Sequence, residues 1–124
     1  MKLINAEKAP AAIGPYSHAV VAGNFVFCSG QLGLDPDTME FKGNSIEDQT
    51  EQVMQNIEIV LEEAGTTMDK IIKTTVFLSD MNDFPAMNRV YEKCLAEHKP
   101  ARAAVEVANL PKEALVEIEC IALL

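Results

Sequence analysis

The sequence predicts an α/β domain of two layers, in which helices pack on one β-sheet. Residues 46–64 carry apolar side chains at helical spacing, and residues 71–78 form a β-branched run without a breaker. The chain then closes with two further apolar, β-prone runs. Because strands and helices alternate in the order β-β-(β)-α-β-α-β-β, residues 1–124 are expected to form a single domain.

The region before residue 45 is predicted to be an extended arm followed by a hairpin. Residues 5–16 hold two prolines and a glycine, which excludes a helix interior. Residues 18–21 and 24–28 flank Ala22-Gly23 and predict a β-hairpin. The glycine in Ser29-Gly30-Gln31 marks a bend or a close approach, and residues 39–41 suggest a short strand.

The two helices have recognisable boundaries. Ser45 and Asp48 resemble a capping box, and Gly65 is a natural C-terminal stop, so the first helix is predicted over 46–64. Asn82 or Asp83 is expected to cap the second helix, which should end near residues 97–100.

The closing strands are predicted at 102–107 and 115–122. Residues 108–114 form a long connection for a tight hairpin, so these strands need not pair with each other. The last strand is apolar on both faces apart from Glu117 and Glu119, which favours a central position in the sheet.

Composition narrows the function classes. A net charge of −9 disfavours a binder of nucleic acid or of anionic membranes, because both need a basic surface. Three cysteines in apolar runs indicate reduced core thiols in a cytoplasmic protein. No apolar run reaches the length of a signal peptide or a membrane span, so we expect a soluble intracellular protein.

The charged residues inside the closing strands are the candidate binding and catalytic residues. Arg102, among small alanines, can bind a carboxylate through two N–H groups, although an ion pair with Glu106 or Glu119 would be a purely structural use. Glu117 shares a strand face with Glu119. A general base, an ion pair with Lys73 or Arg102, and a solvated edge position all remain open for Glu117, whereas Glu119 is more readily structural.

The remaining candidates give weak signals. His18 and His98 are isolated and are expected to be structural, and no His, Asp and Cys set has metal-ligand spacing. Ser29-Gly30-Gln31 lacks a phosphate-loop context.

Several motifs together are similar to the RidA/YjgF/UK114 family, in the expected order and over essentially the whole chain. They are Ala11-Ala12-Ile13-Gly14-Pro15-Tyr16-Ser17, Ser29-Gly30-Gln31, Lys73-Thr74-Thr75-Val76-Phe77-Leu78, Asn82-Asp83-Phe84, Asn88, Pro100-Ala101-Arg102, Leu110-Pro111-Lys112 and Val116-Glu117-Ile118-Glu119.

The resemblance implies a chorismate-mutase-like fold with two helices on one face of a mixed sheet, assembled as a homotrimer with ligand clefts between subunits. It also implies hydrolysis of 2-iminobutanoate and 2-iminopropanoate to 2-oxoacids and ammonia, which protects pyridoxal-phosphate enzymes from reactive intermediates. No metal or organic cofactor is implied.

The resemblance also implies roles for single residues. Arg102 would bind the substrate carboxylate and Glu117 would activate water. Cleft-lining residues would bind the substrate: Tyr16, Ser29, Gly30, Asn88, Ala103 and Ala104.

One position departs from the family pattern: many close members carry a cysteine where this chain has Ala104. Thiol chemistry or redox regulation at that position is therefore not expected here. A carboxylate-binding or chaperone-like trimer without turnover is the second hypothesis, and ribonuclease activity fits the charge poorly.

Overall fold

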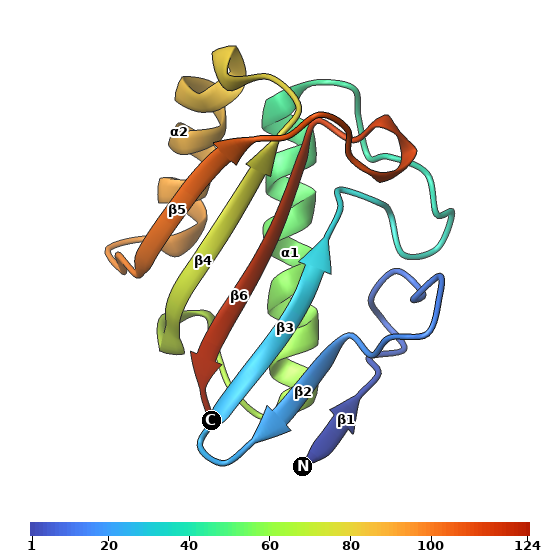
Figure 1. The fold of residues 1–124 in the computed structure, drawn as a ribbon, viewed down its shortest axis with the longest axis vertical. Coiled ribbons are helices and arrows are strands. Elements are labelled where there is room, and N and C mark those ends of the chain that lie inside the picture. The colour runs from blue at the N-terminus through green and yellow to red at the C-terminus, as the bar shows by residue number, and fades with distance from the viewer.

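A computed structural model describes all 124 residues as one six-stranded mixed sheet with two helices behind it (Figure 1). The sheet order is β1-β2-β3-β6-β4-β5. The strands are β1 (Lys2–Ile4), β2 (Ala19–Ala22), β3 (Phe25–Gln31), β4 (Ile71–Leu78), β5 (Ala101–Glu106) and β6 (Val116–Leu123), and the helices are α1 (Ile46–Ala64) and α2 (Phe84–Leu95). The predicted two-layer α/β class, with both helices on one face, is confirmed.

The register explains how the sheet is built. β2 and β3 form the predicted hairpin, and β6 runs antiparallel between β3 and β4. β5 pairs in parallel with β4 at the edge of the sheet. The central position of β6 is confirmed, and the two closing strands do not pair because β4 lies between them.

Helix α1 begins and ends where the sequence predicts. The Ser45 side chain accepts a hydrogen bond from the Asp48 backbone N–H at 3.0 Å, which satisfies a free donor of the first turn. Gly65 adopts the left-handed conformation with φ of 94°, and its N–H bonds back to the last turn.

Two local predictions differ from the structure, and one strand has no counterpart among the predictions. Helix α2 ends at Leu95 rather than near 97–100, because Ala96 leaves the helical region with φ of 55°. Residues 39–41 form no strand, only a single bridge between Phe41 and Leu34. Strand β1 was not predicted, since three residues that pair only with the edge of β2 carry little periodic signal.

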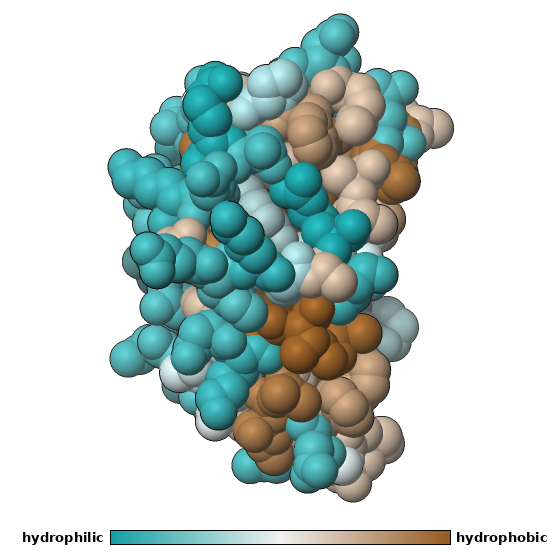
Figure 2. Space-filling view, turned by 90° about the vertical axis from the view of Figure 1, so that its left-hand side faces the viewer, coloured by the Kyte–Doolittle hydropathy of each residue, from teal (hydrophilic) through white to brown (hydrophobic).

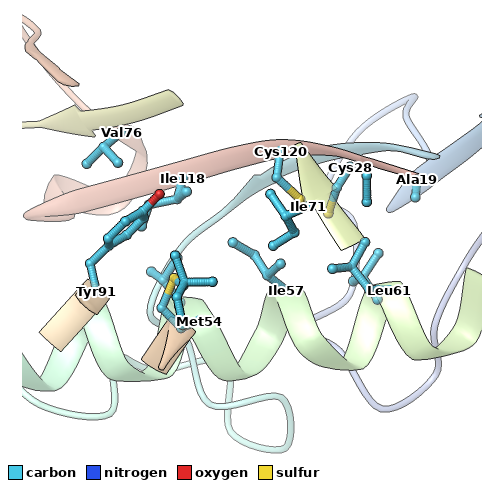
Figure 3. Packing of buried hydrophobic residues seen from close by; sticks show 14 of the residues in the cluster. Ala19, Cys28, Met54, Ile57, Leu61, Ile71, Val76, Tyr91, Ile118 and Cys120 are labelled. Atoms are coloured by element: carbon cyan, nitrogen blue, oxygen red, sulfur yellow. The ribbon is translucent and has the colours of Figure 1, made fainter. Parts of the chain in front are cut away.

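The core lies between the sheet and α1, with α2 closing one end. Figure 3 shows Ile57 and Leu61 of α1 facing Ile71, while Cys28 and Cys120 point from the sheet into the same layer. All five side chains are buried.

The opposite face of the sheet is not covered by the chain. Phe25, Phe27, Val105 and Leu123 each expose more than 40% of their surface there or along its rim. Seen along the β5 edge, polar surface dominates the helical side, and hydrophobic surface gathers toward the sheet side (Figure 2). No helix of the chain is long and apolar enough to cross a membrane.

Candidate functional site

A cavity of about 450 Å³ lies beside Glu117. Its walls come from the N-terminal arm, the end of β3 and the loop before β6, and it includes Tyr16, Ser29 and Gly30. The structure thus brings four of the predicted site residues together in one hollow. It does so because the arm folds back over the β3–β6 pair.

Buried His18 holds that arm in place. Its Nδ1 accepts a hydrogen bond from the Ala6 N–H at 2.9 Å, and its Nε2 donates to the Pro10 carbonyl at 2.7 Å. Both ring nitrogens are therefore used within the chain, which confirms the structural interpretation of His18. His98 is used similarly, because its Nε2 donates to the Ile71 carbonyl at 2.6 Å.

A bulge in β3 shapes the floor of this cavity. The β3–β6 register shifts between Cys28 and Gln31, so the Ser29-Gly30 segment leaves the regular ladder. The Ser29 hydroxyl donates to the Ser17 carbonyl at 2.7 Å and fixes the bulge to the arm. The predicted bend at the glycine is confirmed.

The Glu117 carboxyl occupies the space that a side chain at position 30 would need, so this position favours glycine. A Cβ at position 30 would lie 2.7 Å from a Glu117 carboxylate oxygen and 2.9 Å from its carboxyl carbon. Only a residue without a side chain leaves room for the carboxylate in this place. The glycine motif and the strand carboxylate therefore form a single structural unit.

The Glu117 carboxyl is half-buried and has no cationic partner. The chain's salt bridge joins Lys42 and Asp35 and does not involve Glu117, so the predicted alternative of an ion pair with Lys73 or Arg102 is wrong. Burial, and secondarily the negative charge of Glu119, raise the pKa of Glu117. A carboxylate with a raised pKa in a cavity is a candidate general base.

Arg102 lies at a second cavity of about 400 Å³ between β5 and α2. Its Nη1 donates to Oδ1 of Asn88 at 2.6 Å. The guanidinium carbon lies 5.0 Å from the ring centre of Tyr91 and 5.3 Å from that of Phe84. Asn88 therefore joins Arg102 in this cavity.

The structural alternative for Arg102 is also wrong. Glu106 accepts a hydrogen bond from the Met81 N–H at 2.8 Å, and Arg102 forms no salt bridge with Glu106 or Glu119. The guanidinium charge is thus not neutralised by a carboxylate of its own chain.

Arg102 and Glu117 lie on opposite faces of the sheet. Arg102 pairs in register with buried Thr74 and faces α2, whereas Glu117 pairs with Phe77 and faces the uncovered side. Within one chain the two residues therefore lie at separate cavities.

The two alanines take different positions along β5. Ala104 is half-buried on the same face as Arg102, packed against the core opposite Val76, while Ala103 is exposed on the other face. Neither lines either of the two cavities. No thiol replaces the missing cysteine, since Cys28 and Cys120 are buried beneath the sheet.

Sequence reasoning did not assign Gln31, Lys112, Tyr91 or Phe84 to the site. Gln31 and Lys112 line the Glu117 cavity, and both belong to motifs noted above. In the sequence, Tyr91 and Phe84 look like any other apolar residues on one face of the second helix. Their position under Arg102 depends on the parallel β4–β5 pairing, which no local pattern reveals.

Comparison with known proteins agrees with this fold. The family described as Endoribonuclease L-PSP matches residues 6–124. A RutC family protein of Pyrococcus horikoshii is 54% identical over 98% of this chain and 96% of its own length. The chloroplastic Reactive Intermediate Deaminase A of Arabidopsis thaliana is 48% identical over 99% of this chain and 66% of its own length.

The fold also matches that of a solved protein structure. The crystal structure of Escherichia coli TdcF with bound serine has a TM-score of 0.95 and 41% identity, covering 100% of this chain and 99% of that one. Fold and site thus define a small α/β protein that carries an arginine without a salt bridge at the β5 edge and a half-buried carboxyl beside a separate cavity. The chain belongs to the endoribonuclease L-PSP family, which includes the RidA/YjgF proteins that its motifs resemble.

Proposed function

We propose that this protein is an enamine/imine deaminase that hydrolyses 2-iminobutanoate, 2-iminopropanoate and related intermediates to 2-oxoacids and ammonium. One observation carries the proposal: the chain holds both an Arg102 without a salt bridge and a half-buried Glu117 without a salt bridge, each in a motif that matches the family. The first group suits a substrate carboxylate and the second suits an attacking water. In this role the protein would protect pyridoxal-phosphate enzymes from reactive products.

Arg102 would bind the substrate carboxylate. Asn88 takes one N–H of Nη1, which leaves Nη2 and Nε free to meet the two carboxylate oxygens. The serine bound to TdcF also carries a carboxylate, so a small amino-acid-like ligand suits this family.

Glu117 would direct water at the imine carbon. The ionised carboxylate takes a proton from water as the oxygen attacks C2 of the protonated imine, giving a carbinolamine. Glu117 then returns the proton to nitrogen, the C–N bond breaks as the carbinolamine hydroxyl gives its proton to the departing ammonia, and a 2-oxoacid and ammonium leave. The raised pKa of Glu117 brings this base nearer to neutral pH, where proton transfer in both directions is efficient.

A complete site would need two copies of the chain. Because Arg102 and Glu117 lie on opposite faces of one sheet, we place the substrate in a cleft where Arg102 of one copy approaches Glu117 of another. A homotrimer would close three such clefts and would cover the hydrophobic sheet face. Tyr16, Ser29 and Gly30 would then line the cleft from the Glu117 side, and Ala103 and Ala104 would border it along β5.

The test is complementation between inactive variants. The imine is generated in situ by an amino-acid oxidase or a dehydratase, and release of 2-oxoacid above the uncatalysed rate is measured. Arg102→Ala and Glu117→Ala should each reduce the rate to background. When the two variants are unfolded and refolded together, about one quarter of the clefts would receive both intact residues and activity should return.

The outcomes separate the hypotheses. A wild-type rate equal to background, with 2-oxobutanoate still bound, would leave a carboxylate-binding trimer without turnover as the function. Active wild type without recovery in the mixture would contradict the shared cleft. The net charge of −9 argues against RNA as the substrate, despite the descriptive name of the family.

A further inference from the structure

The Arg102 guanidinium is held on two aromatic rings rather than by an opposite charge. Its carbon lies 5.0 Å from the centre of the Tyr91 ring and 5.3 Å from the centre of the Phe84 ring, within the range of cation–π attraction. Asn88 fixes one edge of the guanidinium plane at 2.6 Å. Three contacts from α2 thus define where this exposed side chain lies.

The rings are themselves anchored in the core. Tyr91 is 7% exposed, and its hydroxyl shares a hydrogen bond of 2.7 Å with the hydroxyl of buried Thr74. Figure 3 shows the Tyr91 ring rising from α2 toward Ile118 under the sheet. Phe84, the first residue of α2, packs partly buried against the same core. Both rings are therefore part of the folded scaffold and do not depend on Arg102 for their position.

Such a platform differs chemically from an ion pair. A carboxylate partner would compete with a substrate carboxylate for the same N–H groups, whereas a ring face occupies none of them. An unsupported arginine loses rotamer entropy when it binds a ligand, and aromatic packing removes part of that loss in advance.

We propose that Phe84 and Tyr91 are positioning residues that pre-order the Arg102 guanidinium for a bidentate carboxylate ligand. This inference rests on the proposed function only for the identity of that ligand. It predicts that truncating either ring weakens binding of a carboxylate and leaves binding of its uncharged amide analogue nearly unchanged.

Binding is tested with 2-oxobutanoate and 2-oxobutanamide by calorimetry. Phe84→Leu and Tyr91→Leu are expected to weaken binding of the carboxylate by about 5- to 30-fold, the equivalent of losing one ring contact. Tyr91→Phe keeps the ring and should lose less than about threefold. Met87→Leu, a change at a buried α2 residue that is neither of the two rings beneath the guanidinium, is the matched control.

Arginine side-chain dynamics give a readout that does not depend on turnover. The chain has two arginines, so the Nε–Hε signals of Arg89 and Arg102 can be assigned with Arg102→Lys. Wild-type Arg102 should show an order parameter above about 0.6, with exposed Arg89 below it, and Phe84→Leu should lower the Arg102 value.

The results decide the two claims separately. If Arg102 is as mobile as Arg89 in the wild type, or if ring truncation weakens the amide and the carboxylate equally, the positioning role is wrong. If Arg102 is ordered and ring truncation releases it, but wild type binds no 2-oxoacid, the positioning role stands and the proposed function fails.

Discussion

Replacing Gly30 with alanine should remove activity while largely preserving the fold. The added Cβ would lie 2.7 Å from a Glu117 carboxylate oxygen, where an ordinary contact begins at 3.4 Å, so that oxygen must retreat by about 0.7 Å. The atoms that must move are the flexible end of a side chain. Their rotation is expected to cost about 0.5–1.5 kcal/mol of unfolding free energy.

The catalytic cost should be much larger. A misplacement of about 1 Å at a reacting group can lower the rate about 100-fold, so we expect kcat/KM to fall by one to two orders of magnitude in Gly30→Ala. The assay is 2-oxoacid release from imine generated in situ, with urea unfolding measured on the same preparation. Binding of 2-oxobutanoate at Arg102 should change little, because the substitution lies at the Glu117 cavity and not at the Arg102 cavity.

Two comparisons make this prediction specific. In a Glu117→Ala background, Gly30→Ala should cause no additional loss of activity, because the displaced group is already absent. Gly33→Ala provides the contrast, since its Cβ would meet the Gln49 backbone at 2.7 Å and should mainly lower stability. Wild-type kcat/KM in Gly30→Ala would refute the assignment of Glu117 as the water-directing base.

Three further predictions concern charge, thiols and assembly. Burial raises the pKa of Glu117 in the folded state above its value in the unfolded chain. Between these two pKa values the folded protein binds more protons than the unfolded chain, so the free energy of unfolding falls as pH rises through them. Glu117→Gln should therefore raise the melting temperature at pH 7 by about 1–3 °C after solvent screening, with no gain at pH 3, as calorimetry can show. N-ethylmaleimide should leave wild-type activity intact, because the β5 position proposed to border the cleft holds Ala104 and burial raises the pKa of half-buried Cys94. Sensitivity should appear in Ala104→Cys. Phe27→Asp, on the uncovered sheet face, should give a monomer by light scattering and abolish turnover, and an active monomer would contradict the shared cleft.

The sequence predicts elements well where the signal is local. The Ser45 cap, the Gly65 stop and the β-branched run of β4 each specify their own structure, and all three are found as expected. The end of α2 was misplaced because Ala96 takes a positive φ that alanine rarely adopts, so composition gave no warning. Strand β1 exists only through pairing with β2, which is a tertiary effect.

The site was predictable only in part for a similar reason. Arg102 and Glu117 stand out as charges in apolar strands, and family motifs add Tyr16, Ser29 and Asn88. Their division between two faces of the sheet follows from the register, because Arg102 lies opposite Thr74 and Glu117 lies opposite Phe77, and these two β4 residues point to opposite faces. Spacing along the chain carries no information about that register.

The uncovered sheet face bears on the pKa of Glu117. The carboxyl shares that face with exposed Phe27, so a second copy that buried the aromatic surface would also remove water from Glu117. Desolvation is already the main cause of its raised pKa, and further burial would raise the pKa again. Assembly would then supply the missing Arg102 and bring the base closer to the pH at which it works. On the proposed function, assembly would therefore complete the environment in which Glu117 acts as a base.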